Sequence, residues 1–317
     1  MKTFILLIVL SVIAYSQKPV YDTGFSHIGG LSEVIRMNQP ADTLSLLKSE
    51  FLGNKKLLQR EINYPLLAGL SAGYIASGLG VYLYQNNAWW ANNRSSFHFI
   101  DDWDYVRWND KLGHIWATIM LGHAFSVGLE AAEVDYETNM WVSSSAALFF
   151  QLFVEFQDGY ASDWGFSPGD AYADLIGAAF PVIQYYYPAL YNYQMRFSYI
   201  PDRLGKEGLT PGQKVLVMDD YGGHKFWLSV KMENLLPESL KKYWPDFLML
   251  SLGYGVRDLD GSGGGLSDFY ISFDYDYEFI PLYGKFWQMV KNTLGYIKTP
   301  APAIRITNGV AFFGLMF

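Results

Sequence analysis

The pattern of hydrophobic and polar positions changes twice along the chain. Residues 66–84 form an uncharged run, LLAGLSAGYIASGLGVYLY, whose length matches a membrane-spanning helix. Three further stretches, 110–132, 140–158 and 168–187, read as helices joined by short polar connections. We therefore predict four antiparallel helices within residues 62–195.

The uncharged run has two interpretations. Gly69 and Gly73 form a GxxxG pair, and small residues at this spacing let another helix approach closely within a membrane. Trp89 and Trp90 follow where an interfacial aromatic belt would lie. The run could equally be a buried helix of a globular core, and the sequence leaves both interpretations open.

From residue 225 the pattern changes to strands. The segments KFWLSVKM, DFLMLSLGYGV, DFYISFDYDYEFI and AIRITNGVAFFGLMF alternate apolar and polar positions, most clearly at Phe269, Ile271 and Phe273. We predict an antiparallel sheet of four to five aromatic-rich strands over residues 225–317, after a linker at 196–224. A short amphipathic helix is expected at 285–296. The fold class is α+β, and we favour a sheet packed on the bundle over strands that complete a membrane-embedded body with the helices.

The first residues predict export. Lys2 precedes an apolar run at 4–14 that is too short to span a bilayer, and small and polar residues follow it. This is the pattern of a secretory signal peptide over residues 1–16, cleaved after Ser16. Residues 17–61 are expected to be irregular, with an amphipathic helix at 42–59.

Composition narrows the possible partners. The 317 residues carry a formal net charge of −8 without any basic run, which excludes an electrostatic groove for nucleic acid. The sequence contains no cysteine, so any metal would need histidine and carboxylate ligands. Half of the residues are hydrophobic, and the apolar final strand with Phe317 resembles bacterial outer-membrane proteins. We expect an outer-membrane or periplasmic location in a Gram-negative bacterium and a membrane lipid or envelope component as partner. Oligomeric state and cofactor stay open.

Each of the last three predicted helices carries a polar pair at helical spacing. The pairs are Asp110 with His114, Glu155 with Asp158, and Asp170 with Asp174. Isolated buried carboxylates cost several kcal/mol, so such groups are expected to converge and to be paired or metal-bound. The sequence therefore predicts one polar cluster inside the bundle, with Lys111 as its nearest cation.

Two functions fit this cluster. In one, a hydrogen-bond network fixes the helix packing or binds a ligand. In the other, the protein is a hydrolase or transferase acting on an envelope lipid or glycan: His114 or Glu155 is the general base, and Asp158, Asp170 or a bound divalent cation supports it. The sequence has neither HExxH spacing nor a GxSxG elbow. His123 is expected to face away from His114 and to be a core histidine.

Three motifs together resemble a known family. NDKLGH at 109–114, EFQDG at 155–159 and GFSPGDAYADLIGA at 165–178 are similar in order and spacing to the YfiM-like periplasmic lipoproteins of unknown function and the related VanZ-like membrane proteins. The resemblance spans about residues 96–190. It implies an envelope location, and it carries over the following positions: Asp110, Lys111, His114, Glu155, Ser167, Asp170 and Gly177.

The chain departs from the VanZ-like pattern at two places. Trp164 and Gly165 stand where an arginine usually precedes the serine, and Asp174 stands where an asparagine usually follows the aspartate. The charge balance of the cluster therefore differs from that of the VanZ-like proteins. The resemblance supports the location more strongly than any reaction.

Overall fold

The structure is a computed structural model that describes residues 61–88, 90, 93–206, 214–260, 264–307 and 309–316. The predicted signal peptide, the helix expected at 42–59 and Phe317 lie outside these residues. The chain divides into two units, residues 1–94 with 121–149 and residues 95–120 with 150–317. Each unit is described by itself.

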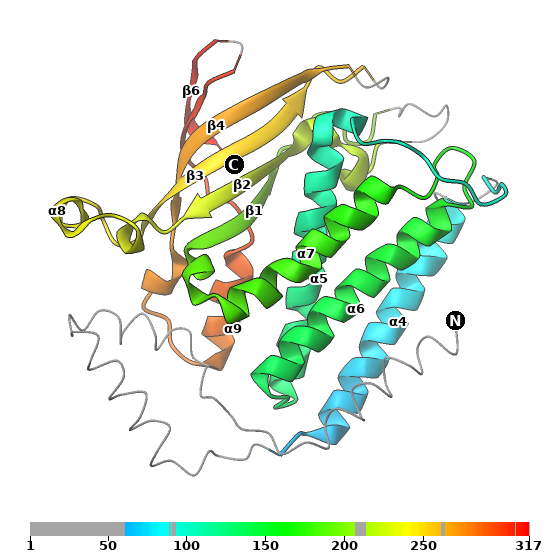
Figure 1. The fold of residues 1–317 in the computed structure, drawn as a ribbon, viewed down its shortest axis with the longest axis horizontal. Coiled ribbons are helices and arrows are strands. Elements are labelled where there is room, and N and C mark those ends of the chain that lie inside the picture. The colour runs from blue at the N-terminus through cyan, green and yellow to red at the C-terminus, as the bar shows by residue number, and fades with distance from the viewer. Residues whose placement is uncertain are drawn as a thin grey trace. The chain divides into compact units, whose positions relative to one another are not determined.

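The described helices follow the predicted order (Figure 1). They are α4 (Tyr64–Ala88), α5 (Asn109–Ala131), α6 (Tyr136–Asp158), α7 (Pro168–Tyr186), α8 (Glu238–Lys241) and α9 (Lys285–Leu294). The strands are β1 (Tyr193–Tyr199), β2 (His224–Val230), β3 (Leu248–Arg257), β4 (Leu266–Tyr275), β5 (Ala301–Arg305) and β6 (Ala311–Met316). The predicted α+β class, helices followed by an antiparallel sheet, is confirmed.

In the first unit, α4 lies against the later part of α5. Leu67 belongs to a buried cluster with Leu129, Ala132 and Val134, and the Tyr74 hydroxyl donates to the Ala124 carbonyl at 2.7 Å. Two described helical segments, Tyr64–Asn87 and Tyr105–Ala131, are long and apolar enough to cross a membrane by length and composition alone. None of the most apolar stretch of the first segment is buried. Trp90, expected in an interfacial belt, is instead buried at 1% exposure.

The second unit contains one antiparallel sheet with the strands in chain order, β1 to β6. The first four lie side by side from green to orange in Figure 1. The sheet thus has six strands where four to five were predicted. The additional strand is β1, at the predicted boundary between the bundle and the linker at 196–224. Tyr193, Met195 and Phe197 alternate with polar residues, which is the pattern of a strand. The strand was not predicted because these residues lie beside a predicted helix.

The sheet has inverted polarity. Along β4 the exposed residues are apolar, Phe269, Ile271 and Phe273, whereas Ser272 and Asp274 are buried on the other face together with Tyr270. One apolar row crosses five strands in register: Leu228, Leu252, Ile271, Ile304 and Phe312. Four of these five side chains are between 39% and 78% exposed, and Ile304 is half-buried. Soluble proteins rarely expose a large continuous apolar surface.

Helix contacts cover one end of the apolar face. The Trp116 ring of α5 lies 4.5 Å from the Phe197 ring of β1, measured between centroids. A Cβ at Gly113 would lie 3.7 Å from the Phe226 ring of β2. The expected packing of the sheet on the helices is therefore found at β1 and β2, while Phe269, Ile271 and Phe273 of β4 stay exposed.

Candidate functional site

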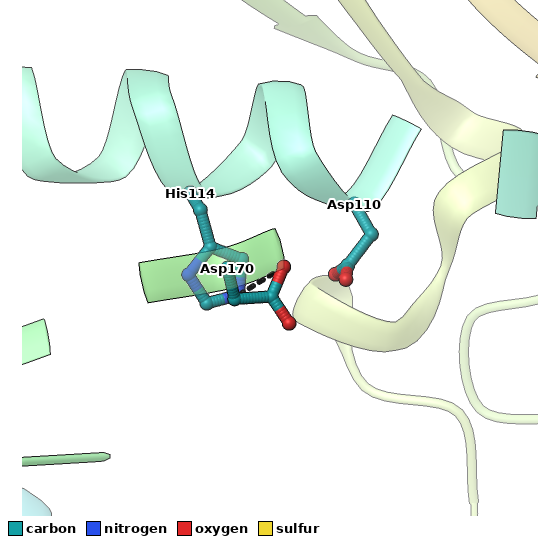
Figure 2. A group of neighbouring side chains, drawn as sticks. All are labelled: Asp110, His114 and Asp170. Atoms are coloured by element: carbon teal, nitrogen blue, oxygen red, sulfur yellow. Dashed lines mark ion pairs between the residues drawn. The ribbon is translucent and has the colours of Figure 1, made fainter. Parts of the chain in front are cut away.

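Helix α5 presents Asp110 and His114 on one side, one turn apart (Figure 2). Its start is abrupt, because Val106, Arg107 and Trp108 have positive φ values of 39°, 55° and 71°. Residues other than glycine rarely adopt this conformation, and each costs about 1–2 kcal/mol. The side chain of Asn109 donates to the Tyr221 carbonyl at 2.9 Å and is buried, which ties the helix start to the segment before β2.

Helix α7 begins with the predicted serine cap. Ser167 Oγ accepts a hydrogen bond from the Asp170 amide at 3.0 Å, and Pro168 occupies the first helical position. The same hydroxyl donates to Asp102 Oδ1 at 2.5 Å. The Ser167 amide donates to Glu155 Oε2 at 3.3 Å. The cap of α7 therefore connects it to α6 and to the segment before α5.

Gly177 lets α7 approach α5 closely. A Cβ at this position would lie 2.5 Å from the Ile115 carbonyl oxygen and 2.8 Å from Thr118 Cβ. Only glycine fits such a separation without displacing backbone. Close packing of the two helices therefore explains why glycine is needed at position 177, which the family resemblance had pointed to. The close approach also brings the carboxylates of α7 near His114.

Lys111 occupies one side of the cluster. Its Nζ atom lies 2.9 Å from Asp102, 3.1 Å from Asp110 and 2.8 Å from Asp170, and its side chain is 4% exposed. Burial favours the neutral amine, but the Asp110 and Asp170 carboxylates outweigh burial and raise the pKa of Lys111. The lysine is therefore a permanent cation with three carboxylates around it.

His114 occupies the other side. Its Nδ1 atom lies 3.1 Å from Asp174 Oδ1, and its Nε2 atom lies 3.7 Å from Asp170 Oδ1 and 3.8 Å from Glu155 Oε1. Burial disfavours the imidazolium, but the hydrogen bond to Asp174 and the charges of the aspartates raise the pKa of His114 well above its ordinary value. Thr118 Oγ1 and Gln151 Nε2 also donate to Asp174 Oδ1, at 3.0 and 3.3 Å.

Glu155 and Asp170 hold protons at neutral pH more readily than free acids do. Burial raises the pKa of Glu155 to about 9, although the charge of His114 opposes it. Burial, with the negative charge of Asp110, raises the pKa of Asp170 to about 7. Both shifts follow from low solvation and a surplus of carboxyl groups over cations.

The structure brings together seven of the eight predicted site residues in one contact network. They are Asp110, Lys111, His114, Glu155, Ser167, Asp170 and Asp174. Asp158, the eighth, is half-buried at the end of α6 and acts on Glu155 through its charge. His123 lies in the first unit, apart from these residues along α5.

Four members of the network were not among the predicted site residues. Asp102 pairs with Lys111, and Tyr221 donates to Asp110 Oδ1 at 2.8 Å. Thr118 and Gln151 both donate to Asp174. Thr118 lies one turn after His114 and could have been found by helical spacing. Asp102 and Tyr221 lie in irregular segments, where the sequence has no helical or strand periodicity from which their positions could be predicted.

Comparison with known proteins identifies the part of the chain that carries this cluster. Residues 103–186 match a family model described as "Predicted periplasmic lipoprotein (DUF2279)". The matched segment includes α7 and every predicted site residue. The match supports an exported, periplasmic or envelope location and the resemblance to periplasmic lipoproteins, while the YfiM and VanZ names stay predictions. Neither a search of curated proteins nor a search of solved structures gives a match.

Two groups of described side chains have ligand atoms close enough to hold one metal ion. Asp110, His114 and Asp170 form one group, and His114, Glu155 and Asp174 form the other. Within each group the ligand atoms lie within 4.8 Å of one another. Both groups share His114, so the imidazole is the centre of any metal chemistry here.

Proposed function

We propose that the protein is a membrane-associated envelope protein that contacts outer-membrane lipid through the exposed apolar face of its sheet. The buried polar cluster is the network that holds together α7 and the parts of α5 and α6 that lie in the second unit. The observation that carries the proposal is the inverted polarity of the sheet.

Lipid-facing strands alternate in the sense seen here, with apolar residues outward and polar residues inward. In β4, Ile271 and Phe273 point outward at 39% and 40% exposure, and Ser272 and Asp274 are buried at 2% and 0%. A water-soluble sheet that packs on helices has the opposite alternation. Lipid chains can cover an exposed apolar row, and they do so without a surface of complementary shape.

Helix α7 shows the same inversion. Asp170 and Asp174 are buried, whereas Tyr172, Leu175 and Ile176 are 58%, 50% and 55% exposed. Its inner side therefore carries charge, and its outer side carries large apolar groups. An apolar environment outside the second unit would explain both the helix and the sheet.

The experiment is flotation of the purified full-length chain with vesicles of phosphatidylethanolamine and phosphatidylglycerol. Replacing both Ile271 and Phe312 by lysine puts charge into the apolar row. Each buried side chain of this size is worth about 1.5–3 kcal/mol, and 1.4 kcal/mol is tenfold, so the bound fraction is expected to fall at least about tenfold.

The matched control is Leu240→Lys, because Leu240 is 51% exposed on α8, outside the sheet. It should leave flotation unchanged. Circular dichroism checks that each variant is folded. Equal flotation of the folded double variant and the unchanged protein would refute a lipid-contacting sheet face.

A further inference from the structure

We infer that His114, Glu155 and Asp170 form a binding site for a divalent transition-metal ion, with Asp174 orienting the histidine. The three ligands come from α5, α6 and α7 (Figure 2 shows two of them with Asp110). The site rests on ligand spacing, on the orientation of the imidazole and on buried oxygens that lack hydrogen bonds.

The spacing at Nε2 is that of metal ligands rather than of a hydrogen bond. Nε2 of His114 lies 3.7 Å from Asp170 Oδ1 and 3.8 Å from Glu155 Oε1, beyond the usual limit for a hydrogen bond. Two ligands bound to one ion at roughly 2.0–2.2 Å stand about 3–4 Å apart. Nε2 therefore has one carboxylate oxygen from α6 and one from α7, each at the separation of two ligands on one ion.

The other ring nitrogen fixes which atom faces that point. Asp174 Oδ1 lies 3.1 Å from Nδ1, so Nδ1 carries the hydrogen and donates it. A bound ion must displace the proton from Nε2 of the imidazolium, and the ring then presents the Nε2 lone pair on the side of Asp170 and Glu155. Metal-binding histidines almost always donate their second N–H to such a carboxylate or carbonyl. Asp174 is itself held by Thr118 and Gln151.

Buried oxygens in the cluster lack hydrogen bonds. Among the residues that the structure describes, Asp170 Oδ1 and Asp174 Oδ2 are buried without a hydrogen-bond partner, and these residues are 5% and 0% exposed. Asp170 Oδ1 has an ion pair with Lys111 at 2.8 Å and faces Nε2 as well. A carboxylate oxygen offers more than one lone pair, so it can contact the lysine and an ion together.

The contacts of Lys111 and other donors indicate which carboxylates are available to bind the ion. Asp110 is fully engaged, since Tyr221 donates to its Oδ1 and Lys111 lies 3.1 Å from its Oδ2. Glu155 uses Oε2 for the Ser167 amide, and its Oε1 faces the histidine. The ligand set is therefore His114, Glu155 and Asp170, and Lys111 balances the carboxylates that do not bind the ion.

One imidazole nitrogen with two carboxylates suits zinc or manganese. Calcium and magnesium prefer all-oxygen sites, whereas imidazole ligands favour transition metals. Three protein ligands would leave coordination positions for water. The probe is therefore Zn²⁺ alone, added to the full-length protein after treatment with a chelator.

The test measures bound zinc by isothermal titration calorimetry and by elemental analysis after dialysis. We expect about one ion per chain. His114→Gln and Glu155→Gln should each weaken binding at least about 100-fold, and Asp174→Asn should weaken it about 10–100-fold, as loss of an orienting carboxylate does. The matched control His123→Gln, on the same helix, should bind normally.

The outcomes are decisive in both directions. If circular dichroism shows that His114→Gln does not fold, the zinc affinity of Glu155→Gln, a neutral isostere, tests the site instead. Absence of stoichiometric zinc in the folded protein, or zinc retained at equal affinity by folded His114→Gln or Glu155→Gln, would overturn the site. Vesicle flotation without zinc reports separately on the lipid-contacting face.

Discussion

Two of the buried charge clusters in the second unit differ in the sign of their surplus charge. The helix cluster gathers five carboxyl groups, from Asp102, Asp110, Glu155, Asp170 and Asp174, around one lysine and one histidine. The sheet cluster gathers two cations around one carboxylate. The helix cluster can accept a further cation, and the sheet cluster cannot.

In the sheet cluster the single carboxylate is saturated. Asp274 Oδ1 lies 2.8 Å from Arg196 and accepts from the Tyr275 amide at 2.9 Å. Its Oδ2 accepts from the Ser229 hydroxyl at 2.9 Å, and Lys298 lies 3.9 Å away. Lys298 Nζ also donates to two backbone carbonyls at 2.7 Å each. The cluster therefore leaves no oxygen of Asp274 without a partner, and its buried atoms without a hydrogen bond are Nε and Nη1 of Arg196.

The difference shows how burial alone fails to identify a site. Both clusters contain side chains at or near 0% exposure. What separates them is the sign of the surplus charge and the kind of atom left without a hydrogen bond, which is a carboxylate oxygen in the helix cluster and a guanidinium nitrogen in the sheet cluster. In the helix cluster Nε2 of His114 faces two carboxylate oxygens beyond hydrogen-bond distance. This separation leaves room for the proposed metal ion.

The largest expected effect comes from Asp274→Asn. Removing the only carboxylate between Arg196 and Lys298 leaves two buried cations without a counter-charge, which should lower the free energy of unfolding by about 3–5 kcal/mol. Urea denaturation followed by circular dichroism measures it. The matched change in the helix cluster, Glu155→Gln in metal-free protein, should cost less than about 1 kcal/mol, because that cluster has carboxyl groups in surplus. Equal losses in the two variants would erase the distinction between the clusters.

The second effect is a pH dependence specific to the sheet cluster. Burial lowers the pKa of Lys298 from 10.5 to about 8, although Asp274 opposes it. Between these values the unfolded chain binds the proton and the folded chain releases it, so stability should rise with pH from about 8 to 10.5. The expected gain is about 3 kcal/mol, on the order set by 1.4 kcal/mol per pKa unit. This gain in the free energy of unfolding should vanish in Lys298→Met. A gain of the same size in that variant would show that other groups cause the pH dependence.

A smaller effect is expected from Gly177→Ala. The new methyl group meets the Ile115 carbonyl and Thr118, and such overpacking costs about 1–3 kcal/mol. It should also weaken zinc binding, since α7 must move away from α5. Gly73→Ala in α4 is the control, because nothing lies within 4 Å of its Cβ position among described residues and alanine favours helices by about 1 kcal/mol. Thermal unfolding compares the two, and a Gly177→Ala variant as stable as the control would refute the close helix approach.

Helices were predictable from the sequence more closely than strands. The predicted segments 110–132 and 168–187 differ by one residue at an end from α5 and α7. Helix α6 begins at Tyr136 rather than at 140, because Asp135 Oδ1 accepts from the Thr138 amide and starts the helix earlier. That cap lay within a segment that read as a polar connection.

The candidate site was predictable where helical spacing places its residues on one face. His114, Glu155 and Asp170 follow from this rule together with the cost of burying charge. The partnership of Arg196 with Asp274 could not be predicted, since it depends on how β2 and β3 connect β1 to the distant β4 in the sheet. The exposed apolar face was also unexpected, because alternation shows that a sheet has two faces and does not show which one is covered.

The most direct test of the contrast between the clusters is a crystal structure with zinc, located by anomalous scattering at the zinc edge. We predict one strong anomalous peak, about 2.0–2.2 Å from His114 Nε2 and from oxygens of Glu155 and Asp170, and none beside Asp274. A map without a peak in the helix cluster, or with its peak beside Asp274, would contradict the account.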